Sequence, residues 1–221
     1  MLEPVPPRVR EYADQVVAYV QRALGIRLEY DSNTLPVLDH YLRTVPEDQP
    51  AALQLVVATS GAYFGEVVRR HLGGRWELGN KEAEWRIVLP TGINFSPAGF
   101  VAAAIARADL EDLDSEITAP PRMMPYLQQA LARMGEVSVD DYYSLCGRLD
   151  TLEHVHEVLV AVAAQMLGNA ADEDEDGAAP ANGDASDDEP GDEADDEDAV
   201  DDDEDDEDED ADAGGASGAV N

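Results

Sequence analysis

The stretch AALQLVVATSGAYFGEVVRRHL, residues 51–72, predicts an α-helix of about six turns, around which we expect the fold to form. Because successive helical residues turn by about 100°, the stretch divides into three faces. The first face is broad and mostly apolar: Leu53, Val56, Val57, Ser60, Phe64, Val67, Val68 and His71. The second face, which we call the glycine strip, has almost no side chains: Ala58, Gly61, Ala62 and Gly65. A helix with two packing faces is expected inside a domain.

The third face is polar and consists of Thr59, Tyr63, Glu66 and Arg70. Glu66 and Arg70 have the i, i+4 spacing of a helical ion pair. Each glycine inside a helix costs about 0.5–1 kcal/mol relative to alanine. We therefore expect a neighbouring backbone to approach the glycine strip closely and to offset that cost.

Charge divides the chain into two parts. All 14 Lys and Arg lie between Arg8 and Arg148, whereas residues 172–212 hold 26 of the 49 Asp and Glu. Of the formal net charge of −35, this acidic stretch contributes −26 and the remainder −9. Residues 1–168 are long enough for one globular domain with a hydrophobic core. Residues 169–221 have few large apolar side chains and repel one another, so they are predicted to form a disordered polyacidic tail.

The sequence favours a cytoplasmic protein. Cys146 is the only cysteine, which excludes an intramolecular disulfide framework and fits a reducing compartment. The segment MLEPVPPR at the N-terminus lacks the apolar core of a signal peptide. We also expect no apolar run of the roughly 18 residues that span a bilayer, and hence no membrane partner.

Helical periodicity, caps and glycine stops predict about five helices besides the central one. They are predicted at about residues 6–25, 32–45, 97–108, 125–134 and 138–166. Ser32, Ser96 and Ser138 are expected to cap the second, third and last of these. The last helix carries an apolar stripe that ends near Met166.

After Gly73 and Gly74 the apolar pattern changes to alternation, which predicts an antiparallel β-hairpin over residues 75–90. Trp76 and Trp85 are expected on its buried face, one in each strand. The stretch 26–30 is a candidate third strand. The predicted fold class is therefore α+β and mainly helical, with about six helices around helix 51–72 and a small antiparallel hairpin.

Glu66 is the candidate catalytic acid or base, with Tyr63 and Arg70 beside it. Such a role requires a desolvated carboxylate with a raised pKa, in a pocket that Tyr63 and a histidine also reach. The available histidines are His40, His71 and His156. The alternative is a solvated Glu66–Arg70 pair that contributes only a few tenths of a kcal/mol, on the order of 0.3. The candidate ligand-binding or partner-binding residues are Thr59, Tyr63, Glu66, Arg70 and Trp76.

Metal, nucleophile and phosphate chemistry find little support. The candidate metal ligands are Cys146, His154 and His156. Because the two histidines are two residues apart on a helix, they face opposite sides; we expect His156 in the core and His154 toward water, and no metal site. Cys146 lacks a nucleophile elbow, and the sequence holds no phosphate loop, dinucleotide fingerprint or zinc-protease motif. We predict no cofactor.

The basic and acidic clusters point to proteins as partners and away from nucleic acid. The one basic cluster, residues 69–71 with Arg75, is too small for a nucleic-acid surface on a chain of net charge −35. The acidic run DDDEDDEDED, residues 201–210, either solubilises the chain or engages a basic protein surface. It lacks the fixed oxygen cage of a specific calcium site.

The segment GAYFGEVVRRHLGGRW, residues 61–76, resembles a family of uncharacterised bacterial proteins in which a G-A-Y-x-G-E-V helix runs into G-x-W and a strand. The fixed positions of that pattern are Gly61, Gly65, Glu66 and Trp76 in this chain. The resemblance implies a small α+β bacterial domain and brings no activity with it. The acidic tail is no part of the resemblance.

Three functional hypotheses follow. The first is a non-catalytic interaction or regulatory module of the bacterial cytoplasm, whose acidic tail solubilises it or engages basic partners. The second is a hydrolase or transferase that uses Glu66 as acid or base in a cleft beside the hairpin. The third is a structural protein that dimerises through the glycine strip; the sequence does not set the oligomeric state.

Overall fold

The computed structural model describes residues 3–46, 48–109 and 114–176. This part of the chain has the predicted mainly helical α+β fold, with seven α-helices and three short strands. The helices are α1 (Pro7–Leu24), α2 (Leu35–Leu42), α3 (Pro50–Leu72), α4 (Pro97–Ala106), α5 (Met124–Arg133), α6 (Val139–Tyr143) and α7 (Leu145–Asp176). The strands are β1 (Arg75–Glu77), β2 (Arg86–Val88) and β3 (Asn94–Phe95). Residues 177–221, most of the predicted tail, lie outside the described residues.

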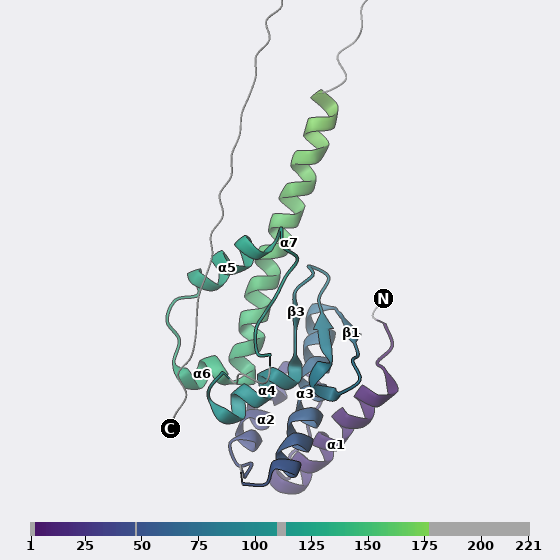
Figure 1. Cartoon of the computed structure of the whole chain (residues 1–221), viewed down its shortest axis with the longest axis vertical. Coiled ribbons are helices and arrows are strands. Elements are labelled where there is room, and N and C mark those ends of the chain that lie inside the picture. Colours follow the sequence, from purple (N-terminus) through teal and green to yellow (C-terminus); the bar gives the residue numbers. More distant parts are fainter. Residues whose placement is uncertain (1–2, 47, 110–113, 177–221) are drawn as a thin grey trace, which may run out of the picture. The chain divides into compact units, whose positions relative to one another are not determined.

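α3 is the central helix, as predicted (Figure 1). It runs unbroken through Gly61, and every residue from Thr59 to Arg69 is buried. α1 packs along one side of α3 and α4 packs along another, while α7 also contacts it. The prediction of a single rod inside the domain is confirmed.

The glycine strip is covered by the chain itself. A Cβ atom placed on Gly61 would lie 2.9 Å from the backbone N and Cα of Ala98, at the start of α4. A Cβ on Gly65 would lie 2.3 Å from the ring of Trp76 and 2.9 Å from Pro97. The predicted close approach is therefore confirmed. The hypothesis of dimerisation through the strip is wrong, because these contacts already occupy it.

The three strands form one antiparallel sheet in the order β1-β2-β3. Trp76 of β1 is paired with Ile87 of β2, which is paired in turn with Phe95 of β3. The predicted hairpin is present. Trp85 is buried, as predicted, but it lies just before β2, whereas Trp76 lies in β1 and is only half-buried.

The prediction of a third strand at residues 26–30 is wrong, since this segment is not a strand and the third strand of the sheet is β3. Tyr30 has a left-handed backbone conformation with φ of +58°, which is incompatible with a strand. Its backbone N–H donates a hydrogen bond to the Tyr63 hydroxyl at 3.0 Å. The segment is therefore held against α3 through this bond and through buried Leu28.

The predicted last helix is two helices. Ser144 between α6 and α7 has an extended backbone, with φ of −71° and ψ of 149°. Asp39 of α2 accepts hydrogen bonds from the backbone N–H groups of Leu145 at 2.8 Å and Cys146 at 3.2 Å, and thereby caps α7. Because Asp39 of α2 caps it, α7 begins as a separate helix after Ser144.

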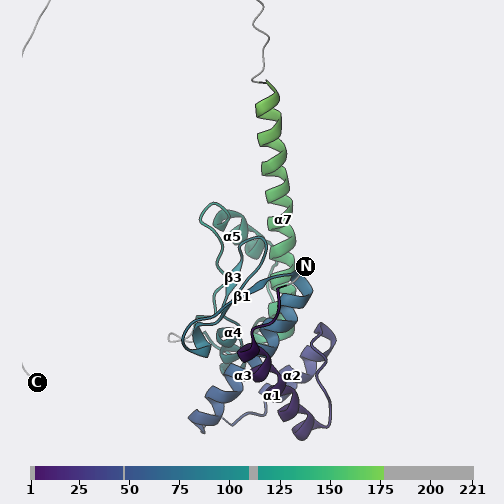
Figure 2. The same ribbon diagram turned by 90° about the vertical axis from the view of Figure 1, so that its right-hand side faces the viewer.

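α7 also runs further than predicted, to Asp176. The predicted boundary between domain and tail at residues 168 and 169 therefore falls inside a helix. Residues 160–171, VAVAAQMLGNAA, contain five alanines and no charge, a composition that favours helix. In Figures 1 and 2 the C-terminal half of α7 extends beyond the other described helices.

Local capping rules were largely correct. Gly25 ends α1 in the left-handed conformation, and the Ser96 hydroxyl accepts a hydrogen bond from the N–H of Gly99 at the start of α4. The Ser138 hydroxyl caps α6. The expected cap at Ser32 is wrong: Asp31, one residue earlier, caps the 3₁₀ turn Ser32–Thr34 that leads into α2.

The expectation that no apolar run is long enough to span a bilayer is also wrong. α3 contains an 18-residue window of mean hydropathy 1.3, in which Glu66 is the one charged residue. Within the fold, 61% of that window is buried. Its apolar side chains therefore form the core of the domain.

Adding one methyl group to the glycine strip should destabilise the domain. We expect Gly61→Ala to lower the free energy of unfolding by about 1–3 kcal/mol, because the new Cβ meets the backbone of α4 and this overpacking exceeds the gain in helix propensity. Urea unfolding followed by circular dichroism measures this change.

Gly168→Ala is the matched control for that experiment. Gly168 lies in α7 with nothing within 4 Å of the added Cβ, so we expect unchanged or slightly raised stability. Equal stabilisation by both substitutions would contradict the close approach at Gly61.

Candidate functional site

Glu66 is the centre of the candidate site and is only 2% exposed. Arg69 donates to it twice, from Nε to Oε2 and from Nη2 to Oε1, both at 2.8 Å. Arg70 donates from Nε to Oε1 at 2.7 Å. The indole Nε1 of Trp76 completes the set with a longer bond to Oε2 at 3.4 Å. We call these four residues the Glu66 cluster.

The four hydrogen bonds occupy the Glu66 carboxylate fully. A carboxylate has about four lone-pair positions, and each oxygen of Glu66 accepts two bonds. Burial raises the pKa of Glu66, but the hydrogen bonds and charges of Arg69 and Arg70 lower it by more, so that the pKa lies below its usual value. The raised pKa expected of a catalytic acid or base is therefore contradicted.

The alternative of a solvated surface pair is also wrong. Arg69, which lies one turn from Glu66 on the inner side, is buried together with it. Its Nη1 donates to the backbone carbonyl of Glu3 at 3.0 Å. The cluster thereby links two segments to the central helix: Arg69 holds the segment before α1, and Trp76 holds strand β1.

Arg70 forms the outer part of the cluster. Its side chain is 46% exposed, in contrast to that of Arg69. The guanidinium carbon lies 4.5 Å from the centre of the Tyr30 ring, a cation–π contact that contributes about 0.5–1 kcal/mol at an exposed position. Arg70 therefore connects Glu66 to the loop after α1.

Tyr63 lies one turn before Glu66 and belongs to a second hydrogen-bonded group. Its hydroxyl is bonded to the Thr34 hydroxyl at 2.8 Å and accepts the N–H of Tyr30 at 3.0 Å. Burial raises the pKa of Tyr63. Thr59 is fully buried, and its hydroxyl donates to the carbonyl of Leu55 within the same helix. Neither hydroxyl is presented to solvent.

The histidines proposed as partners of Glu66 lie elsewhere. His40 is exposed on α2, and the Nε2 atom of His71 contacts a carboxylate oxygen of Glu153 in α7 instead of facing the core. His156 is half-buried and shares a hydrogen bond of 3.0 Å with the Thr91 hydroxyl; burial lowers its pKa. None of the three has a hydrogen bond to Glu66 among the described residues.

Glu66 also lines neither of two hollows in the described part of the chain. One is a cavity of about 10 Å³, room for a single water molecule, where α2, α4 and α6 meet. The other is an open depression of about 470 Å³ over the start of α1, lined by residues between Pro4 and Asp14. Neither hollow is the predicted pocket that Glu66 and Tyr63 would share.

The candidate metal ligands do not come together. Among the described residues no three His, Cys, Asp or Glu side chains could hold one metal ion. Burial, with Asp39 nearby, raises the pKa of Cys146 to about 12.

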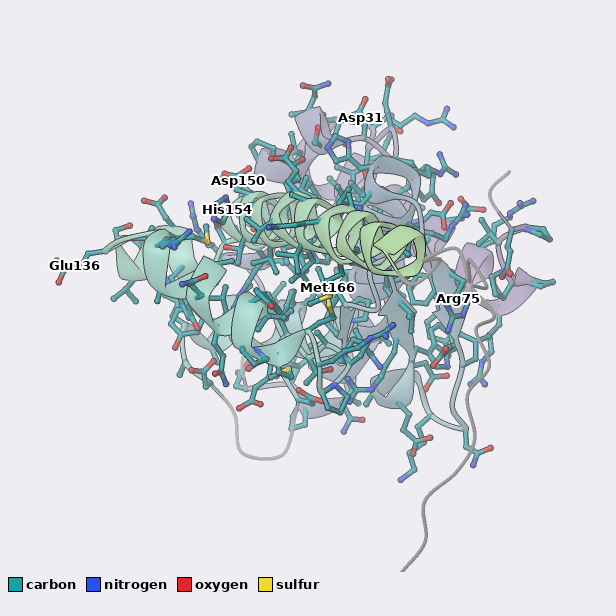
Figure 3. All side chains as sticks on the ribbon, turned by 90° about the horizontal axis from the view of Figure 1, so that it is seen from above. Asp31, Arg75, Glu136, Asp150, His154 and Met166 are labelled. Carbon is teal, nitrogen blue, oxygen red and sulfur yellow. The ribbon has the colours of Figure 1, made fainter. Side chains whose placement is uncertain are left out.

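His154 was expected to face water, but its Nε2 atom is buried and has no hydrogen-bond partner in the described chain. α7 is contacted by α2, α3, α4, α5 and α6, so more than one of its faces is covered. Figure 3 shows His154 beside Asp150 on one side of α7 and Met166 on another.

Sequence reasoning missed three buried polar residues. Arg69 was noted only within a basic cluster, although its i, i+3 spacing from Glu66 was readable. Asp39 caps α7 from about a hundred residues away, a contact with no local signal. Arg148 is buried with its guanidinium 4.4 Å from the Tyr142 ring and 4.7 Å from the Phe100 ring.

Comparisons of the chain with protein-family models, curated proteins and solved structures find no match.

The two arginines that share Glu66 should differ in their effect on stability. We expect Arg69→Met to lower the free energy of unfolding by about 3–5 kcal/mol, because it leaves a buried carboxylate without its main partner. Arg70→Met should cost about 1 kcal/mol or less, since Arg70 is half exposed and Arg69 still neutralises Glu66. Urea titrations of both variants test this ranking, and a larger cost at Arg70 would contradict it.

The lowered pKa of Glu66 predicts a specific dependence of stability on pH. A group whose pKa is lower in the folded state stabilises the fold above its unfolded pKa, which is near 4.5 for Glu66. This contribution is lost as the pH falls through the folded pKa. We therefore expect the free energy of unfolding of the wild type to exceed that of Glu66→Gln near pH 7. The difference should shrink below pH 4.5; a difference that is constant with pH would contradict this prediction.

Proposed function

We propose that the chain is a non-catalytic interaction or regulatory module of the bacterial cytoplasm, whose acidic C-terminal region engages basic surfaces of other proteins. The observation that carries this proposal is the separation of charge along the sequence. No Lys or Arg follows Arg148, whereas residues 172–212 contain 26 Asp and Glu. A run of this charge density attracts cationic surfaces over a distance of about one Debye length, roughly 8–10 Å in ordinary salt.

The Glu66 cluster supports this proposal because it gives Glu66, the candidate catalytic acid or base, a structural role. All four acceptor positions of the carboxylate are taken by side chains of the same domain. A proton donated to or taken from Glu66 would have to displace an arginine from a buried ion pair. The domain is accordingly proposed as the folded carrier of the acidic region.

We also propose that the residues shared with the bacterial pattern mark a packing joint. Gly65 lies under the ring of Trp76, Gly61 lies under the start of α4, and Trp76 donates to Glu66. Gly65, Glu66 and Trp76 therefore meet between the central helix and β1, and Gly61 lies one turn away against the start of α4. Such residues would be retained for packing in any protein with this joint.

An affinity capture experiment tests the proposed role of the acidic region. The full-length chain is immobilised and exposed to a nuclease-treated bacterial extract at about 0.05 M salt, and bound proteins are eluted at about 0.3 M, where charges are screened more strongly. We expect the eluted proteins to be basic. A variant with all ten residues of 201–210 changed to Asn or Gln should capture at least about tenfold less of them.

The matched control exchanges Asp for Glu and Glu for Asp at the same ten positions. It keeps the charge and changes the order of the side chains, so it should capture the same proteins as the wild type. Identical protein sets from all three baits, insensitive to salt, would refute the proposed role of the acidic region.

A further inference from the structure

The C-terminal half of α7 carries apolar side chains that the rest of the described chain leaves uncovered. Val160 is 49% exposed, Met166 38% and Leu167 74%. In the core stripe of the same helix, Leu159 is fully buried, and Val162 and Ala163 are partly buried against the core. In Figures 1 and 2 this half of α7 extends beyond α5 and the sheet.

Val160 and Leu167 belong to a stripe distinct from the core stripe, whereas Met166 is i+7 from Leu159 and continues the core stripe. Val160, Ala164 and Leu167 have i, i+4, i+7 spacing and lie on one face of the helix. Residues 160–171 contain no charged side chain. A solvated helix normally carries polar residues on its outer face, so an uncharged stretch here requires an explanation other than solvation.

The next residues along the helix are the acidic run DEDED, residues 172–176, with which α7 ends. An apolar stripe is therefore followed directly by a cluster of negative charge on the same helix. A surface that fits both must be apolar in its middle and positive at one end. Such a combination is typical of helix-in-groove recognition with an electrostatic rim.

We propose that residues 160–176 of α7 dock into an apolar groove of a partner protein, with Lys or Arg side chains of that partner facing residues 172–176. This proposal rests on the proposed function and deepens it, because it names the element that makes the specific contact. The acidic region beyond α7 then adds attraction that depends on charge alone, and the stripe adds selectivity for apolar surfaces.

Charge argues against two other occupants of the stripe. Parallel pairing with a second copy would place two DEDED runs side by side on chains that each carry −35, which repel one another. A membrane surface with anionic lipids would repel the same run. A basic-rimmed protein groove satisfies both parts of the helix.

Two synthetic peptides of equal length and lysine content serve as probes. One is an amphipathic Leu–Lys helix, and in the other every Leu is replaced by Gln. We expect the full-length wild type to bind the Leu–Lys peptide at least about tenfold more tightly by fluorescence anisotropy, since burial of one or two large apolar side chains suffices for that ratio.

Substitutions on α7 should remove this preference. Leu167→Gln and Val160→Gln are expected to reduce the ratio of the two affinities to about twofold or less. Leu78→Gln is the control, because Leu78 is an exposed leucine (43%) outside α7; it should keep the wild-type ratio. Circular dichroism verifies that each variant retains its helix content.

The outcomes separate this inference from the proposed function. Equal binding of both peptides, or a ratio that survives the combined Leu167→Gln and Val160→Gln change, overturns the inference alone. Binding of neither peptide overturns the proposed function as well. If sedimentation velocity shows a dimer that dissociates on Leu167→Gln, the stripe binds a second copy of the chain.

If the chain cosediments with phosphatidylcholine vesicles and Leu167→Gln abolishes this, the stripe binds lipid. Either result overturns the inference.

Discussion

The close contact between the glycine strip and its neighbours determines where the other elements lie. Gly61 admits the backbone of α4, and Gly65 admits the ring of Trp76. Because Trp76 belongs to β1 and is paired with Ile87, its position over α3 also sets the position of the sheet. Two missing side chains, one turn apart, therefore fix a helix and a sheet against the same central rod. The loss of helix propensity at two glycines, about 1 kcal/mol each, is the cost of this arrangement.

The Glu66 cluster completes the same joint with charge. A buried carboxylate loses several kcal/mol of hydration, on the order of 5 or more, and a buried ion pair often does no better than apolar residues of equal volume. The Glu66 cluster contributes mainly by fixing the positions of the segments that it contacts. Arg69 fixes the backbone at Glu3, Arg70 lies over Tyr30, and Trp76 is oriented by its indole N–H. Three segments from different parts of the chain are thereby held at defined positions against α3.

The sequence predicted features that depend on residues close together in the chain. The central helix, its glycine strip, the hairpin and most caps follow from periodicity and from single residues such as Gly25 and Ser96. Features that depend on distant residues were missed. The cap of α7 comes from Asp39, and Tyr30 leaves the extended conformation because Tyr63 binds its N–H. For the site, the sequence identified Glu66, Arg70 and Trp76 but not the buried Arg69 that pairs with Glu66, because a helical wheel does not show how many neighbours cover a face.

The start of α7 explains how one helix can serve both the core and a surface. Its N-terminus lies in the interior, where Leu145 is fully buried and the free N–H groups need an acceptor. Asp39 supplies both the acceptor and a negative charge at the positive end of the helix dipole. With its first turn fixed in this way and its middle packed against α5, α7 continues without further support from the domain. Residues 160–176 therefore continue the helix that the domain holds at its start, so the domain sets the direction of this stretch, which a flexible linker would not do.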